Sequence, residues 1–194
     1  MPRSREFDQD DVLDRAMLLF WAQGYEATSV RDLITAMGIS SSSLYEAFGD
    51  KQAVFLAALA RYCTIEQARV RQMADAAATP QSFVEALFTS LDDLNQYPGQ
   101  TRGSFAFNTM VEFGTRHEGV TKQLLDHYYK IVDIIAAKLA EEQSAGAISS
   151  ALPPLHLTHT ILSTLQGLAT LKSVQADFAH RQAVTQMILH LLDR

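Results

Sequence analysis

Four consecutive serines, Ser40 to Ser43, offer the plainest chemistry in this sequence, because four hydroxyl groups can donate hydrogen bonds to an anion. Serine runs are often flexible linkers. Here, however, Leu44 and Phe48 follow at helical spacing, and Gly38 and Gly49 bracket the stretch. This pattern predicts a helix of about two turns that begins at Ser40. Its first backbone N–H groups and the serine hydroxyls are suitable donors for phosphate oxygens.

Other residues that could carry chemistry form no catalytic or metal-binding pattern. Cys63 is the single cysteine, and we interpret it as a buried, unreactive residue rather than a redox trigger. His156 and His159 have the spacing of half a metal site, but no carboxylate or thiol accompanies them at definite spacing. HExxH, ExxH, GxSxG, GxGxxG and P-loop motifs are absent from the sequence. We therefore predict that the protein is not an enzyme and needs no metal or cofactor.

Composition places the sequence among globular proteins, since 47% of its 194 residues are hydrophobic. No apolar run approaches the roughly 18 residues of a membrane span, and the first residues lack the apolar centre of a signal peptide. We therefore expect a cytoplasmic protein. The net charge is −6, and residues 1–51, with five Lys/Arg and nine Asp/Glu, contribute −4. Charge alone thus argues mildly against a nucleic-acid partner, which a basic patch would favour.

The elements that must position the serines are helices. Apolar residues recur at helical spacing along nearly the whole sequence, without convincing alternation, so we predict an all-α fold. The first four helices are predicted to begin after the N-caps Asp8, Thr28 or Ser29, Ser40 and Asp50, and Ser29 with Asp32 has the spacing of a capping box. The resulting order is helix, short helix, tight glycine turn, short helix and long helix. This is the outline of a three-helix DNA-binding unit that contains a helix-turn-helix.

A change of composition at residues 74–80 predicts a boundary between two regions. We assign residues 1–52 to a helix-turn-helix domain, residues 50–73 to a connecting helix, and residues 74–194 to a second domain. In this second domain, periodicity predicts a helix from about residue 83, a long helix that closes near Gly146, and two last helices at about 155–173 and 178–192.

Three stretches in the first 55 residues resemble the signature of the tetracycline-repressor (TetR/AcrR) family of bacterial regulators. They are GYEATSVRDL at residues 24–33, MGIS at residues 37–40, and SLY at residues 43–45, with Phe48 and Lys51 after them. The resemblance implies a DNA-reading domain. It implies that Thr28, Ser43, Tyr45 and Lys51 contact phosphates and that Ser41 and Ser42 face bases. We also assign Ser29 and Ser40, at the starts of the second and third helices, to the DNA-binding residues. Arg3 and Arg5 are expected to form an arm that enters the minor groove.

Two residues depart from the family's usual pattern. Members often carry Lys or Arg at the position of Ser41, and an aromatic residue or His at the position of Glu46. Ser41 removes a bidentate guanine contact worth roughly 1–3 kcal/mol, and Glu46 repels the DNA backbone if it faces it. We therefore expect weak direct readout, with selectivity that comes from DNA shape and from the spacing of two paired heads.

The resemblance also implies a homodimer whose second domain encloses a small-molecule site. We expect a repressor that a small, mostly apolar ligand releases from a palindromic operator by moving the fourth helix. A degenerate helix-turn-helix protein that serves as a protein-interaction module stays open as the alternative. The expected ligand-binding residues are Phe88, Leu91, Phe105, Asn108, Met110, Val111, Tyr128 and Gln166, among which the two amides most need a hydrogen-bond partner. The expected dimer interface comprises Leu157, Ile161, Leu165, Leu168, Val184, Met187, Ile188 and Leu191.

Overall fold

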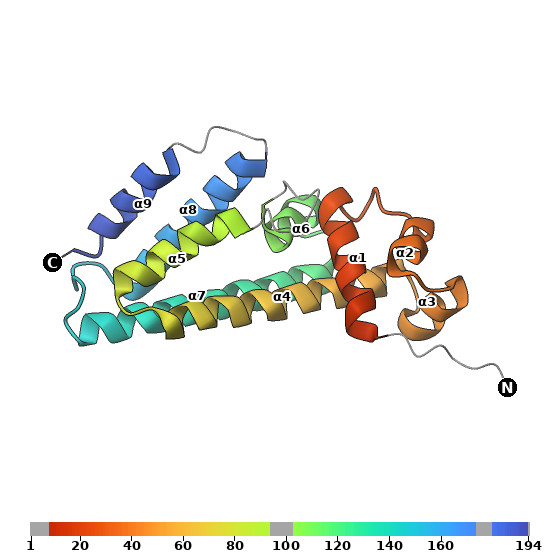
Figure 1. The fold of residues 1–194 in the computed structure, drawn as a ribbon, viewed down its shortest axis with the longest axis horizontal. Coiled ribbons are helices and arrows are strands. Elements are labelled where there is room, and N and C mark those ends of the chain that lie inside the picture. The colour runs from red at the N-terminus through yellow and green to blue at the C-terminus, as the bar shows by residue number, and fades with distance from the viewer. Residues whose placement is uncertain (1–7, 94–102, 174–179, 194) are drawn as a thin grey trace.

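The computed structural model describes residues 8–93, 103–173 and 180–193, and in these ranges it contains nine helices and no strand (Figure 1). This confirms the predicted all-α fold. The helices are α1 (Gln9–Gln23), α2 (Val30–Met37), α3 (Ser41–Phe48), α4 (Lys51–Ala76), α5 (Pro80–Asp93), α6 (Phe105–Phe113), α7 (Glu118–Ser144), α8 (Pro154–Ser173) and α9 (His180–His190). None of the helices in the described ranges is long and apolar enough to span a bilayer.

The molecule is elongated along its two longest helices. α4 and α7 run side by side through its length, with α1, α2 and α3 forming a head at one end (Figure 1). α5, α8 and α9 lie over the other end, and α6 sits between them and the head. The long α4 therefore connects the head directly to the rest of the protein.

The N-caps predicted from the sequence are present, and of the two candidates Thr28 and Ser29 the cap of α2 is Ser29. A backbone N–H group of the following turn donates a hydrogen bond to the side chain of each of them: Asp8, Ser29, Ser40 and Asp50. At Ser29 the cap is a complete capping box, because the Asp32 carboxylate accepts in return from the Ser29 N–H at 2.9 Å. Gly38 ends α2 with a φ of 68°, a left-handed conformation that favours glycine. Local signals thus define where the short helices α2 and α3 begin and end.

Buried apolar side chains form two cores. The head core contains residues from α1, α2 and α3, the part of α4 up to Cys63, α6, and the start of α7. The body core contains Val70 and Ala74 of α4 together with residues of α5, α7, α8 and α9. α4 thus belongs to both cores. Composition suggested a boundary at residues 74–80. In the structure α6, which follows that boundary in the sequence, packs with the head core.

Aromatic contacts fix α6 against the head. Phe55 of α4 lies edge-on to Phe20 at a ring separation of 4.9 Å and is stacked with Phe113 of α6 at 5.1 Å. The Trp21 indole N–H donates to the Gly103 carbonyl oxygen at 3.0 Å, just before α6 begins. Such aromatic pairs contribute roughly 0.5–1.5 kcal/mol each beyond the area that they bury. A movement of α6 must therefore disturb the head core.

Candidate nucleic-acid interface and ligand cavity

The four serines have different roles at the start of α3. The Ser40 hydroxyl oxygen accepts from the Ser43 N–H at 3.1 Å, and it lies 2.9 Å from the Ser42 hydroxyl oxygen and 2.8 Å from that of Ser43. Ser41 is exposed, and its hydroxyl makes no hydrogen bond to any part of the chain that the structure describes. Ser40 thus stabilises the helix start, while the Ser41 side chain faces solvent.

Tyr45 and Lys51 flank the far end of α3. The Tyr45 side chain is 52% exposed. The Lys51 ammonium lies 4.2 Å from the centroid of the Tyr25 ring, a cation–π arrangement that orients it. Lys51 is also the first residue of the 26-residue helix α4. A helix N-terminus and a cation together favour an anion, so this corner is chemically suited to a phosphate.

Thr28 and Ser29 lie in the turn before α2. Thr28 is 1% exposed, and its hydroxyl donates to the Gly24 carbonyl oxygen at 2.7 Å. The Thr28 hydroxyl is therefore already used within the head, and the phosphate contact expected at Thr28 stays a prediction. The exposed Ser29 hydroxyl donates to the Asp32 carboxylate at 2.6 Å, and these hydrogen bonds lower the pKa of Asp32. The predicted arm residues Arg3 and Arg5 lie outside the described residues.

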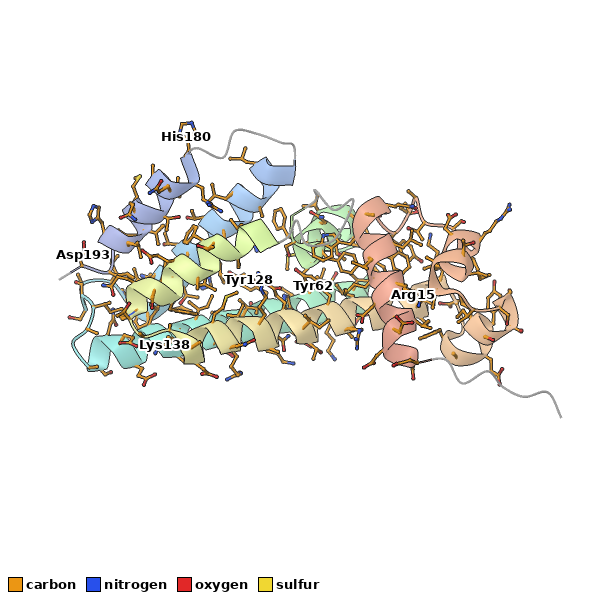
Figure 2. All side chains as sticks on the ribbon, viewed as in Figure 1. Arg15, Tyr62, Tyr128, Lys138, His180 and Asp193 are labelled. Atoms are coloured by element: carbon orange, nitrogen blue, oxygen red, sulfur yellow. The ribbon has the colours of Figure 1, made fainter. Side chains whose placement is uncertain are left out.

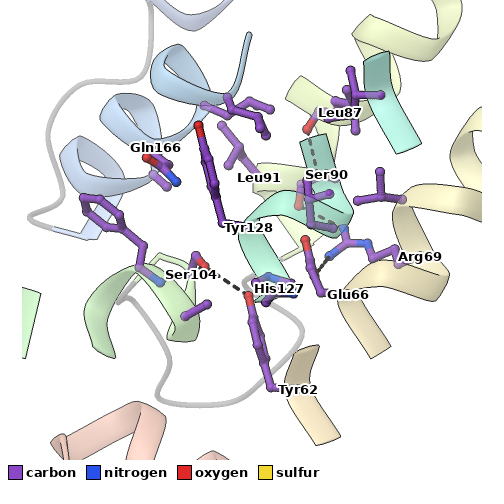
Figure 3. A pocket seen from close by; sticks show the side chains of 18 of the residues that line it. Tyr62, Glu66, Arg69, Leu87, Ser90, Leu91, Ser104, His127, Tyr128 and Gln166 are labelled. Atoms are coloured by element: carbon purple, nitrogen blue, oxygen red, sulfur yellow. Dashed lines mark hydrogen bonds and ion pairs between the residues drawn. The ribbon is translucent and has the colours of Figure 1, made fainter. Parts of the chain in front are cut away.

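A cavity of about 120 Å³ lies among α4, α5, α6, α7 and α8 (Figure 3). Four of the eight predicted ligand-binding residues line it: Leu91, Met110, Tyr128 and Gln166. Leu165, which was assigned to the dimer interface, lines it as well.

The other four predicted ligand-binding residues are not among the residues that line the cavity. Phe88 and Phe105 are 1% and 2% exposed and belong to the body core and the head core. Val111 is 71% exposed, on the outer side of α6. Asn108 is half-buried on the same helix. Their placement follows from the orientation of α6, which apolar composition alone does not determine.

Several polar residues of the cavity were missed in the sequence, including Tyr62, Glu66, Arg69, Ser104 and His127. The Tyr62 hydroxyl lies 3.2 Å from the Ser104 hydroxyl, and the Arg69 guanidinium donates to the Ser90 carbonyl oxygen at 3.1 Å. One signal could have found Glu66. It follows Tyr62 by four residues and precedes Val70 by four, so a charged residue occupies the apolar stripe of α4.

Burial is the main cause of the pKa shifts of the titratable groups in and near the cavity. It raises the pKa of Glu66, which the Arg69 guanidinium lowers to a smaller extent. Burial, and then the charge of Lys130, lower the pKa of His127 to about 4. His127 is therefore neutral at neutral pH. Burial also raises the pKa of the buried Cys63 thiol to about 12, so that this thiol stays protonated, in agreement with its interpretation as unreactive.

His159 has a hydrogen-bonding partner on α7. The His159 Nδ1 atom lies 2.8 Å from the Tyr128 hydroxyl oxygen. In the ranges described above, no group of three or more His, Cys, Asp or Glu side chains is arranged to hold a metal ion.

The predicted dimer-interface residues fall into two groups. Leu157, Ile161, Leu168 and Ile188 are at most 8% exposed and pack in the body core of their own chain, which corrects their assignment to a partner surface. Leu165 and Val184 are half-buried against the same core. Met187 and Leu191, in contrast, are 69% and 39% exposed. The exposed apolar residues of α8 also include Leu155 and Leu171, which are 47% and 52% exposed. Figure 2 shows the side chains of the described residues on the ribbon, with His180 marking the start of α9.

A helix-turn-helix head on a helical body with its own cavity is the arrangement of a DNA-binding transcriptional regulator, and comparison with known families agrees. Residues 12–58 match the family model described as bacterial regulatory proteins of the tetR family. Residues 80–188 match the tetracyclin repressor-like C-terminal domain. The chain belongs to the tetR family and is a DNA-binding regulator of transcription.

Individual relatives resemble it along most of its length. The uncharacterized HTH-type transcriptional regulator YezE of Bacillus subtilis (strain 168) is 28% identical over 200 residues, which cover 100% of both chains. The HTH-type transcriptional repressor ComR of Escherichia coli (strain K12) is 28% identical and covers 86% of this chain and 80% of its own. A cysteine-substituted form of the TetR family regulator CifR, solved with 26-base-pair operator DNA, is 27% identical. It aligns with a TM-score of 0.84 over 98% of this chain and 99% of its own.

Proposed function

We propose that the protein is a cytoplasmic repressor that binds a palindromic operator as a homodimer and leaves it when a small, mostly apolar molecule enters the cavity. The observation that carries this proposal is the position of α4. Its first residue, Lys51, lies against the Tyr25 ring of the head, and Tyr62, Glu66, Arg69 and Val70 of the same helix line the cavity.

The path from cavity to head also includes α6. Ala106, Phe107 and Met110 of α6 line the cavity, whereas Phe105 and Phe113 pack in the head core. A ligand that displaces α6 or the middle of α4 thus changes the packing of the head. In a dimer, a small rotation of each head changes the distance between the two α3 helices and weakens binding to half-sites one helical turn apart.

Two features support DNA as the partner, in preference to the alternative of a protein-interaction module. The Lys51 ammonium and the N-terminus of α4 form a site suited to a phosphate. CifR, which is 27% identical, has been solved with operator DNA, and ComR is named a repressor. The proposal assigns the protein no catalytic activity.

Selection of bound sequences from a random pool of duplex DNA tests the proposal. We expect enrichment of a palindrome with two half-sites separated by about one helical turn. The variant Lys51→Ala should weaken binding to the selected sequence, whereas Lys122→Ala, an exposed lysine of α7, should leave it unchanged. Absence of any enriched sequence would favour the protein-interaction module instead.

A further inference from the structure

We infer that the cavity binds an uncharged, mostly apolar molecule of about the size of one aromatic ring, whose hydroxyl or N–H group donates a hydrogen bond to Glu66. This inference rests on the proposed role of the cavity as the effector site, and it names the chemical class of the effector.

The size follows from the volume of the cavity. It measures about 120 Å³, and an apolar cavity of about 150 Å³ is known to hold benzene. Most of the lining is apolar, with Leu87, Leu91, Ile131, Ile135 and Leu162 contributed by α5, α7 and α8. A molecule that fills this space is therefore small and largely hydrocarbon.

The hydrogen bond follows from the state of Glu66. Its carboxylate lines the cavity, and 29% of its side-chain surface is accessible. It accepts no hydrogen bond from any residue that the structure describes. Among the described residues the cation paired with it is Arg69, whose Nη1 atom lies at 4.0 Å, beyond hydrogen-bond distance (Figure 3). A carboxylate can accept about four hydrogen bonds, so the Glu66 carboxylate retains capacity for a donor that enters the cavity.

The other hydroxyl groups of the cavity already have partners. Tyr62 and Ser104 bond each other, and Tyr128 bonds His159. Gln166 lies on the opposite side of Tyr128 from Glu66 in the close view of the cavity (Figure 3). Glu66 is therefore the acceptor to which an incoming donor adds most.

The absence of charge on the ligand follows from the balance of charges in the lining. The lining holds one acidic and one basic side chain, Glu66 and Arg69, and His127 is neutral because burial lowers its pKa to about 4. A cationic ligand would face Arg69, and an anionic ligand would face Glu66, in surroundings that screen charge poorly. A neutral donor leaves this balance unchanged.

Titrations monitored by ¹⁹F NMR test the inference on the full chain without DNA. The probes are 4-fluorophenol and 4-fluorotoluene, which have nearly the same shape and differ in a hydroxyl against a methyl group. We expect 4-fluorophenol to bind roughly 10-fold more tightly or better, the factor typical of a hydrogen bond to a charged acceptor. Glu66→Met should abolish this preference, and Glu66→Gln, the milder change, should reduce it. The control Glu85→Gln alters an exposed carboxylate of α5 and should have no effect.

Several results would overturn the inference. They are equal binding of the two probes, binding of neither, a preference that survives both substitutions of Glu66, or tighter binding of 4-fluorobenzylamine or 4-fluorobenzoate. Release of operator DNA, measured separately by fluorescence anisotropy, distinguishes the two proposals. If 4-fluorophenol binds through Glu66 but leaves DNA bound, the proposed function fails and the ligand class stands. If only molecules without a donor release DNA, the ligand class fails and the proposed function stands.

Discussion

Two substitutions of Ser40 distinguish the stability of α3 from its ability to contact DNA. Its hydroxyl oxygen accepts the N-capping hydrogen bond of α3 at 3.1 Å. Ser40→Ala should lower the free energy of unfolding by about 1 kcal/mol and weaken DNA binding, because the first turn of α3 then frays. Ser40→Asp retains a good cap but places a negative charge beside the expected phosphates, so stability should recover while DNA affinity falls.

Urea unfolding and fluorescence anisotropy with the selected operator measure the two effects of Ser40. Ser41→Ala is the matched control for stability, since the Ser41 hydroxyl makes no hydrogen bond in the described ranges, and it should leave unfolding unchanged. If the added carboxylate of the Ser40→Asp variant left DNA affinity at the original level, α3 would not present its first turn to phosphates.

His127 should make the protein less stable in mild acid. Its pKa is about 4 in the folded state, against an ordinary value of 6.5, mainly because it is buried, where Gln67 and the Tyr62 ring face it. Below pH 6.5 the unfolded chain takes up a proton that the folded chain does not, so stability falls as pH falls. The slope approaches about 1.4 kcal/mol per pH unit until the pH nears the folded pKa.

Comparison of His127→Gln with the unchanged protein isolates this effect. Glu66, whose pKa is raised, makes both proteins more stable as the pH falls, so its contribution cancels in the comparison. Urea unfolding at about pH 7 and about pH 5, on either side of the ordinary histidine pKa, should show a smaller loss of stability in the variant. An identical loss in the two proteins would mean that His127 accepts its proton while folded.

At the scale of elements, Glu112 connects α6 to the turn that follows α1. Its two carboxylate oxygens accept from the Tyr25 N–H at 3.0 Å and from the Glu26 N–H at 2.9 Å. Glu112→Gln leaves one carbonyl oxygen for two donors. The expected loss of stability is about 1–2 kcal/mol, and the amides of Tyr25 and Glu26 should exchange their hydrogens faster.

Hydrogen exchange followed by mass spectrometry or NMR checks this prediction. The control Glu118→Gln removes an exposed carboxylate at the start of α7 that accepts no hydrogen bond from the described residues. Gly24→Ala provides an independent change at the same contact, because its Cβ would lie 3.1 Å from a Glu112 carboxylate oxygen, at a φ of 83°. Unchanged exchange at Tyr25 and Glu26 in both variants would show that α6 does not hold this turn.

The same elements show what the sequence can predict. The caps at Ser29 and Ser40 were predicted because a capping signal involves only three or four neighbouring residues. The bond from Glu112 to Tyr25 spans 87 residues and has no local signal. Leu157 and Ile161 were predicted to contact the second chain of a dimer. An apolar stripe indicates that a helix face is covered, but not which neighbouring element covers it.

At the scale of the whole molecule, an acidic protein binds DNA through few cations. The net charge is −6, and the cations expected at phosphates or in the minor groove are Lys51, Arg3 and Arg5 of each head. A dimer with six such contacts should show a slope of roughly −5 for the logarithm of the binding constant against the logarithm of salt concentration. Lys51→Ala should make this slope shallower by about 2, since each dimer loses two contacts. A slope near zero in the unchanged protein would contradict phosphate binding by these residues.

The exposed apolar surface of α8 and α9 gives the last prediction, which concerns the dimer. Met187 is 69% exposed, and Leu171 is 52% exposed. A charge at the centre of an apolar interface is strongly unfavourable. Met187→Glu should therefore produce monomers in analytical ultracentrifugation while the fold is kept.

DNA affinity should fall with the dimer, by about 100-fold or more, because two linked heads bind one operator far more tightly than one head alone. Val111→Glu is the matched control, since Val111 is an equally exposed apolar residue, at 71%, but belongs to α6. It should remain dimeric. If Met187→Glu also stayed dimeric and bound the operator normally, the two chains would have to pair through another surface.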